Sequence, residues 1–217
     1  MPDSTALSDA KPGLPGISGS EYCANAIGSS GWALMGHTVL AVPVPALDDV
    51  VRERTAFYDS SFVSGDPEFA HAHITLLGPW TERPSAEDLG CVARIAETVT
   101  PFEVKLTQIH EFPDGVICLR PEPDSQLREL TARLVAAFPQ FPPYGGQYPD
   151  VVPHLTLDRR STTVTPATVS ASIRHLLPLT VRVDRIDLQW WANHDCRRLH
   201  TWPLGCHPGR AGARVGP

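Results

Sequence analysis

HITL (residues 73–76) and HLTL (residues 154–157) are the two stretches that decide the fold. Each alternates a histidine and a threonine with Ile or Leu. Because side chains two apart on a β-strand share a face, we predict two strands whose aliphatic residues enter the core. On the opposite face, His73 would lie beside Thr75, and His154 beside Thr156. A single motif of this kind is usually structural, so the second copy carries the argument.

The two motifs lie at matching points of an internal repeat. The segments VLAVPVPALDDVVRER (39–54) and VICLRPEPDSQLRELT (116–131) each read as a strand, a Pro-x-Pro break and the acidic start of a helix. Aligning the prolines gives an offset of 78 residues, and each segment is followed about 30 residues after its second proline by its His-x-Thr-Leu motif. The chain therefore contains a duplicated strand-helix-strand unit.

Apolar spacing and turn residues predict the remaining elements. Residues 1–30 are rich in Pro, Gly and Ser and are expected to be a flexible arm, 31–205 the folded domain, and 206–217 a tail. Ser85 is the expected N-cap of one helix. The predicted strands are 37–45, 69–78, 102–112, 114–121, 150–157, 179–191 and 197–204, and the predicted helices are 46–62, 85–99, 124–138 and 166–177.

Composition narrows the class of protein. The 217 residues suffice for one core or two small lobes that share one. A net charge of −6 argues against wide coverage of duplex nucleic acid. No apolar run approaches the roughly 20 residues of a membrane span, and the N-terminus lacks the features of a secretory signal. We expect a cytoplasmic monomer with five reduced cysteines, and the Arg-rich, Lys-poor usage suggests a high-GC bacterial genome.

Paired histidines suit phosphodiester chemistry. If the two halves pack with pseudo-two-fold symmetry, both His-Thr pairs can face one cleft. One imidazole can then take a proton from water or a hydroxyl while the other donates a proton to the departing oxygen, without a metal or other cofactor. The threonine hydroxyls can bind the phosphoryl oxygens.

These motifs resemble the two-histidine (2H) phosphoesterase superfamily, particularly its RNA 2′,5′-ligase or 2′,3′-cyclic phosphodiesterase group. The resemblance covers about residues 37–205 and includes PHLTL at 153–157 and the closing LQWWANHDCRRLHTWPLG at 188–205. It implies an α+β fold of two pseudo-symmetric lobes, each an antiparallel β-sheet flanked by helices, with the active-site cleft between them. His73 and His154 would be the catalytic acid/base pair, and Thr75 and Thr156 would bind phosphate.

Other candidates have structural alternatives. Arg159 matches a family arginine that can hold a phosphate, or it is a solvated arginine. Trp80 can stack on a base or cap the core, and Tyr144 can line the cleft or pack in its loop. His71, with His73, would be only half of a metal site, so we predict no metal. We also expect separate structural roles for five C-terminal residues whose types can bind metal: His194, Cys196, His200, Cys206 and His207.

The sequence favours a metal-independent phosphoesterase that opens a 2′,3′-cyclic phosphate on a nucleotide or short RNA end, with 2′,5′ ligation as the reverse reaction. One alternative is a biosynthetic step on another phosphorylated small molecule. Another is a nucleotide- or RNA-end-binding protein without turnover, although two intact His-Thr pairs argue against it. The near symmetry of the motifs leaves open which histidine is the acid and whether a 2′- or a 3′-phosphate is released.

Overall fold

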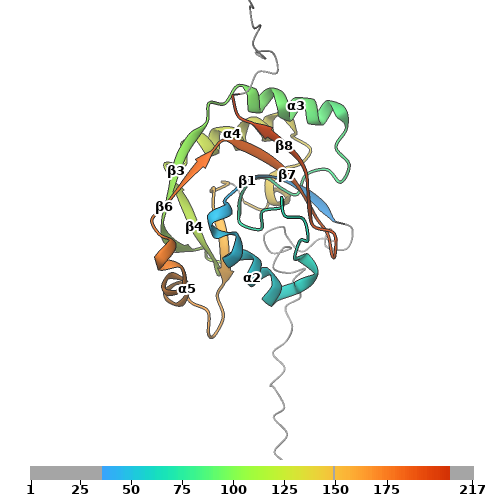
Figure 1. Ribbon diagram of the computed structural model, residues 1–217. Helices are drawn as coiled ribbons and strands as arrows, with labels where there is room; N and C mark the ends of the chain where they lie inside the picture. Colours follow the sequence, from blue (N-terminus) through green and yellow to red (C-terminus); the bar gives the residue numbers. More distant parts are fainter. Residues whose placement is uncertain (1–35, 149, 206–217) are drawn as a thin grey trace, which may run out of the picture.

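The computed structural model describes residues 36–148 and 150–205 (Figure 1). The predicted arm (1–30) and tail (206–217) lie outside these residues. Two four-stranded antiparallel sheets flanked by helices form an α+β fold, as predicted. The first sheet has the order β2 (His73–Leu77), β1 (His37–Pro43), β7 (Arg185–Trp191) and β8 (Arg197–Pro203). The second has the order β5 (Leu155–Arg159), β4 (Val116–Glu122), β3 (Phe102–Glu111) and β6 (Leu179–Val183).

Two of the four α-helices within the described residues belong to the repeated units. The four are α2 (Asp48–Asp59), α3 (Ala86–Glu97), α4 (Ser125–Ala137) and α5 (Pro166–Ile173), with short 3₁₀ helices η2 (Pro45–Leu47), η3 (Ser60–Phe62), η4 (Pro143–Gly146) and η5 (Arg174–Leu176). The units β1-α2-β2 and β4-α4-β5 correspond. Their helices cross between the halves, because α2 contacts β5 and α4 contacts β2. Helix α3 packs on β8 and α4, and α5 packs on β3 (Figure 1).

Strand register refines the alignment of the repeat. Ala41 pairs with Thr75 in the first half, and Cys118 pairs with Thr156 in the second. Ala41 and Cys118 are 77 positions apart, one fewer than the offset between the aligned prolines. The two Pro-x-Pro segments are therefore displaced by one residue relative to the strands.

A shared hydrophobic core joins the two sheets. Alternate strand residues from both halves enter it, including Leu40, Ile74, Leu119 and Leu155, all fully buried. A smaller apolar cluster lies at the first sheet and contains Phe62, Phe69, Trp191 and Cys196 together with Val39 and Ala41. No helix in the described part of the chain is long and apolar enough to cross a membrane.

The predicted cap of α3 is confirmed as a capping box. The Ser85 hydroxyl accepts the Asp88 N–H at 3.1 Å, and the Asp88 carboxylate accepts the Ser85 N–H at 2.8 Å. The two residues satisfy backbone donors that the first turn leaves free, an arrangement that typically contributes about 1 kcal/mol.

The single strand predicted over 179–191 is wrong. It is two strands, β6 at the edge of the second sheet and β7 inside the first, separated at Asp184. The burial pattern explains the break: Val181 and Val183 are buried, and the next buried position is Ile186. The buried positions are odd-numbered before Asp184 and Arg185 and resume at Ile186 after them. One continuous strand could not keep the same face toward the core across this shift.

The strand predicted over 69–78 is shorter than expected. It begins at His73, because preceding backbone groups bond to other partners. The Asp48 carboxylate accepts the Ala72 N–H at 2.9 Å, and the Ala72 carbonyl accepts the Val44 N–H at 2.8 Å. Gln189 donates its side-chain N–H to the Ala70 carbonyl at 2.7 Å.

Candidate active site

The two motif histidines are held in the same way. The Nδ1 atom of His73 lies 2.8 Å from the His71 carbonyl oxygen, and Nδ1 of His154 lies 2.8 Å from the Val152 carbonyl oxygen. Because a carbonyl can only accept, Nδ1 must carry the proton in both rings. Nε2 of the neutral imidazole is therefore the free proton acceptor in each half.

Each half fixes the backbone before its histidine through a helix residue. In the first half, the α2 residue Asp48 accepts the Ala72 N–H and lies 3.4 Å from His71 Nδ1. In the second half, the α4 residue Arg128 donates to the Val151 carbonyl at 3.3 Å and to the Asp150 carboxylate at 2.9 Å. The same task is thus performed by a carboxylate in one half and by a guanidinium in the other.

Thr75 and Thr156 follow their histidines on the edge strands β2 and β5, which contact one another. Both are partly exposed. Within 36–148 and 150–205, neither hydroxyl has a hydrogen-bond partner, so both are available to a ligand.

Burial governs the charge of the pair. The pKa of His73 is lowered to about 4, chiefly by burial and in smaller part by the charge of His154. Burial also lowers the pKa of His154, as does the nearby charge of Arg120. A proton on His154 therefore disfavours a second proton on His73, so burial and this repulsion both act against a doubly protonated pair.

A cavity of about 420 Å³ opens beside His154. Its lining includes His154, Thr156 and Arg159, and every lining residue lies between positions 112 and 159. In the first half, aromatic rings pack beside the motif histidine. There, the ring of Trp191, which is only 7% exposed, lies 5.5 Å from His73 and 4.8 Å from Phe69. The surroundings of the two motif histidines therefore differ.

Aromatic rings and Arg159 border the cavity. Tyr144 lies nearly parallel to His154 at 6.5 Å, Phe112 meets the same imidazole edge-on at 4.9 Å, and Tyr148 meets Tyr144 edge-on at 5.7 Å. The Nη2 atom of Arg159 donates to the Asp114 carbonyl at 2.9 Å. The structure therefore brings the predicted residues Tyr144 and Arg159 to His154.

Tyr144 adopts a left-handed backbone conformation with φ of 52°. Such values are uncommon for a residue with a side chain and are often found at functional sites. Its N–H donates to the Gly78 carbonyl at 3.0 Å, which ties the loop of the second half to the end of β2. This contact fixes the ring beside His154.

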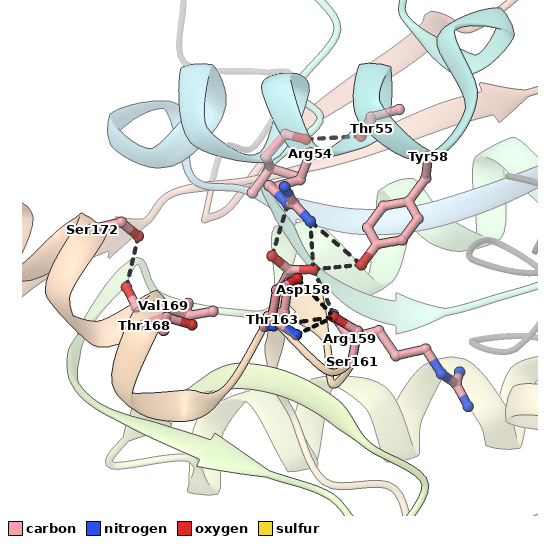
Figure 2. Close-up of polar contacts among 12 residues, drawn as sticks. Arg54, Thr55, Tyr58, Asp158, Arg159, Ser161, Thr163, Thr168, Val169 and Ser172 are labelled. Atoms are coloured by element: carbon pink, nitrogen blue, oxygen red, sulfur yellow. Dashed lines mark hydrogen bonds and ion pairs between the residues drawn. The ribbon is translucent and has the colours of Figure 1, made fainter. Parts of the chain in front are cut away.

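A buried carboxylate connects the two halves next to the site (Figure 2). Asp158 on β5 accepts hydrogen bonds from Tyr58 Oη at 2.6 Å and Arg54 Nη2 at 3.1 Å, both on α2. Its second oxygen forms an ion pair with Arg54 Nε at 2.7 Å. The Arg159 N–H donates to the same carboxylate at 2.8 Å. The contacts fix the strand that carries Thr156 against a helix of the other half.

Trp80 is not in the site, and its prediction as a substrate-binding residue is corrected. It is 1% exposed and packs edge-on against Phe138 at 5.0 Å. The backbone N–H of Trp80 also donates to the Thr38 carbonyl at 2.8 Å. The glycine and proline before it turn the chain inward after β2, so core packing is its role.

His71 has structural contacts on both ring nitrogens. Nε2 accepts the Ser64 N–H at 3.1 Å, and Nδ1 faces the Asp48 carboxylate. In the described residues, no group of three or more His, Cys, Asp or Glu side chains is placed to hold a metal ion. Of the C-terminal group, Cys206 and His207 lie outside those residues, while Cys196 is buried and donates to the Ala192 carbonyl at 3.3 Å.

Several residues near the site escaped sequence reasoning. Arg120, Phe112 and Tyr148 line the cavity, and the Arg54–Asp158 pair supports it. Arg120 lies in β4 and is a charged residue among the aliphatic residues of that strand. This interruption of the aliphatic pattern is the signal that could have identified it. Nothing local in the sequence marks Asp158 and Arg54 as partners, since they are 104 positions apart.

Comparisons with known proteins identify the fold and the family. The family model of the 2′-5′ RNA ligase superfamily matches residues 43–195. The crystal structure of TT0787 of Thermus thermophilus is 20% identical, with coverage of 77% of this chain and 97% of that chain and a TM-score of 0.50. E. coli LigT complexed with 3′-AMP is 21% identical, with 78% and 98% coverage and a TM-score of 0.47. None of the curated proteins compared with the chain matches it.

Proposed function

Because the chain belongs to the 2′-5′ RNA ligase superfamily, we propose that it is a metal-independent phosphoesterase that opens 2′,3′-cyclic phosphates on nucleotides or short RNA ends. The observation that carries the proposal is the matched Nδ1–carbonyl bond of His73 and His154, which leaves two Nε2 atoms for proton transfer. The hydroxyls of Thr75 and Thr156 supply donors for phosphoryl oxygens.

The cavity beside His154 supports one assignment of the proton-transfer roles. In an in-line displacement, the attacking and leaving oxygens occupy opposite sides of the phosphorus. The leaving oxygen belongs to the ribose, so the organic part of the substrate must lie on its side. The cavity that can hold this part adjoins His154. His154 is therefore the acid for the leaving oxygen, and His73 is the base for water.

The reaction then balances without another group. Water attacks phosphorus and gives its proton to His73 Nε2, while the bond to one ribose oxygen breaks and that oxygen takes the proton of His154 Nε2. The product is a nucleoside phosphomonoester with a free neighbouring hydroxyl. The burial-lowered pKa of His73, about 4, keeps that ring neutral and fit to accept a proton.

The test is hydrolysis of the four nucleoside 2′,3′-cyclic monophosphates in EDTA by the wild type and by His73→Ala and His154→Ala. Each substitution should lower the rate by about 10²- to 10⁴-fold, the usual contribution of general acid–base catalysis. His175→Ala is the control, because His175 is exposed on η5, away from the motif strands. Wild-type rates in both motif variants, or activity that EDTA abolishes, would refute the proposal.

A further inference from the structure

Arg120 lies beside His154 without a counterpart in the first half. In the ladder of β4 and β5, Cys118 pairs with Thr156 and Leu119 with Leu155, so the next position brings Arg120 alongside His154. Cross-strand neighbours share a face of the sheet. The position beside His73 is occupied by Pro43. At this ladder position, the repeat therefore places a cation next to His154 and a proline next to His73.

The side chain of Arg120 is incompletely satisfied. Its Nε is buried and has no hydrogen-bond partner, and in the described residues no carboxylate forms an ion pair with it. Its guanidinium lies 5.0 Å from the centre of the Phe112 ring and lines the cavity. Several other arginines do have carboxylate partners, as Arg54 has Asp158 and Arg128 has Asp124.

A guanidinium in a mainly apolar cavity is costly unless an anion meets it. The nearest acidic side chains of the lining already have partners. Asp150 pairs with Arg128. Asp114 accepts the Val116 N–H at 3.2 Å and interacts with Tyr148. The charge of Arg120 is therefore left for a ligand.

We propose that Arg120 is a catalytic residue that donates hydrogen bonds to the non-bridging oxygens of the phosphate held at His154 and Thr156. The inference rests on the proposed function, since the ligand is the scissile phosphate. A guanidinium can donate two parallel hydrogen bonds to such a group. It would stabilise the negative charge that grows as water adds to phosphorus, and it would do so from the leaving-group side.

A second consequence separates this role from simple packing. Burial and the charge of Arg120 lower the pKa of His154, while its bond to the Val152 carbonyl and the charge of Asp114 raise it. Arg120 therefore makes the imidazolium a stronger acid. Removing the charge should raise the pKa of His154 and move the alkaline limb of the rate profile to higher pH. Loss of packing alone would leave that limb in place.

The experiment compares Arg120→Met and Arg120→Lys with the wild type. Methionine keeps an aliphatic stem over Phe112, and Arg174→Met is the control because Arg174 is exposed on η5. We would measure kcat/KM for a 2′,3′-cyclic nucleotide from pH 4 to 9, binding of inorganic phosphate by calorimetry, and the melting temperature. Arg120→Met should lower kcat/KM by about 10²- to 10³-fold, as loss of a preorganised donor does. It should also weaken phosphate binding and shift the alkaline limb upward, while Arg120→Lys falls between it and the wild type.

The outcomes distinguish this inference from the proposed function. In one outcome the wild type is active, and Arg120→Met keeps the same kcat/KM, phosphate affinity and alkaline limb. This result would overturn the role of Arg120 and leave the proposed function intact. Arg120→Met could instead lose rate and melt at a lower temperature while its alkaline limb stays in place. This result would show that Arg120 serves packing and would also overturn the proposed catalytic role. In another outcome the wild type binds phosphate but turns over no cyclic nucleotide, and Arg120→Met does not bind phosphate. The anion site would then be supported, and the proposed function would be refuted.

Discussion

Replacing Arg54 with Met should destabilise the protein and weaken the join between its halves. The substitution keeps an aliphatic side chain beside Phe57, where the Arg54 guanidinium now lies 4.4 Å from the ring centre. It removes both contacts to Asp158, whose side chain is 6% exposed. The carboxylate would keep the Tyr58 hydroxyl and the Arg159 N–H as donors but lose its counter-charge.

The magnitude follows from burial. Removing one partner of a fully buried pair costs about 3–5 kcal/mol, but the Arg54 side chain is 24% exposed. Water therefore screens part of the interaction, and a charged hydrogen bond worth about 2–3 kcal/mol is the better guide. For a domain of this size, each kcal/mol corresponds to about 2–4 °C. We expect the melting temperature to fall by about 4–12 °C.

Thermal melts and urea titrations of Arg54→Met, Asp158→Asn and the double variant give the coupling energy directly. Arg52→Met is the matched control, because Arg52 is exposed on the same helix. The single variants should each lose more stability than the control, and the double variant less than their sum. An Arg54→Met protein that melts with the Arg52→Met control would show that Asp158 does not need its cation and would refute the reasoning.

Two further predictions concern pH. For wild-type kcat/KM, protonation of His73 near its lowered pKa of about 4 should set the acid limb, and deprotonation of His154 below the ordinary 6.5 should set the alkaline limb. The optimum should fall between these limbs, and an optimum above pH 7 would contradict the assigned roles. Stability should also fall in acid. Burial lowers the pKa values of both His37 and His73 to about 4 from 6.5, so their contribution is complete above pH 6.5 and is lost as the pH falls toward 4. Urea titrations of the wild type and His37→Gln at pH 7, 5.5 and 4.5 test this. His37→Gln should lose less stability in acid than the wild type, and an identical loss would argue against the assignment.

The fold was predictable because its signals are local and duplicated. Alternation at 73–76 and 154–157 specifies which side chains enter the core, and Pro-x-Pro followed by an acidic helix start marks the same unit twice. The Ser85 cap was readable because its partner Asp88 is three residues away. The break at Asp184 was also visible as a phase change, but a chain that leaves one sheet for another has no local signature beyond that shift.

The site was predictable only in its repeated part. His73, Thr75, His154 and Thr156 follow from the motifs, whereas the cavity depends on side chains from separate loops and strands. Trp80 shows the limit, because an aromatic residue just after a motif strand can turn toward a ligand or into the core. The contact with Phe138 that fixes it lies 58 positions away.

The repeat supplies two equivalent histidines, but acid–base catalysis needs them to differ. The difference comes from residues that the repeat does not preserve. Pro43 stands beside His73 where Arg120 stands beside His154, and Trp191 packs against one imidazole where Tyr144 borders a cavity at the other. In the proposed reaction, the organic part of the substrate lies toward the second half, where the cavity is. The direction of proton transfer would then depend on the unmatched residues around the pair, while the matched motif provides the two groups that exchange protons.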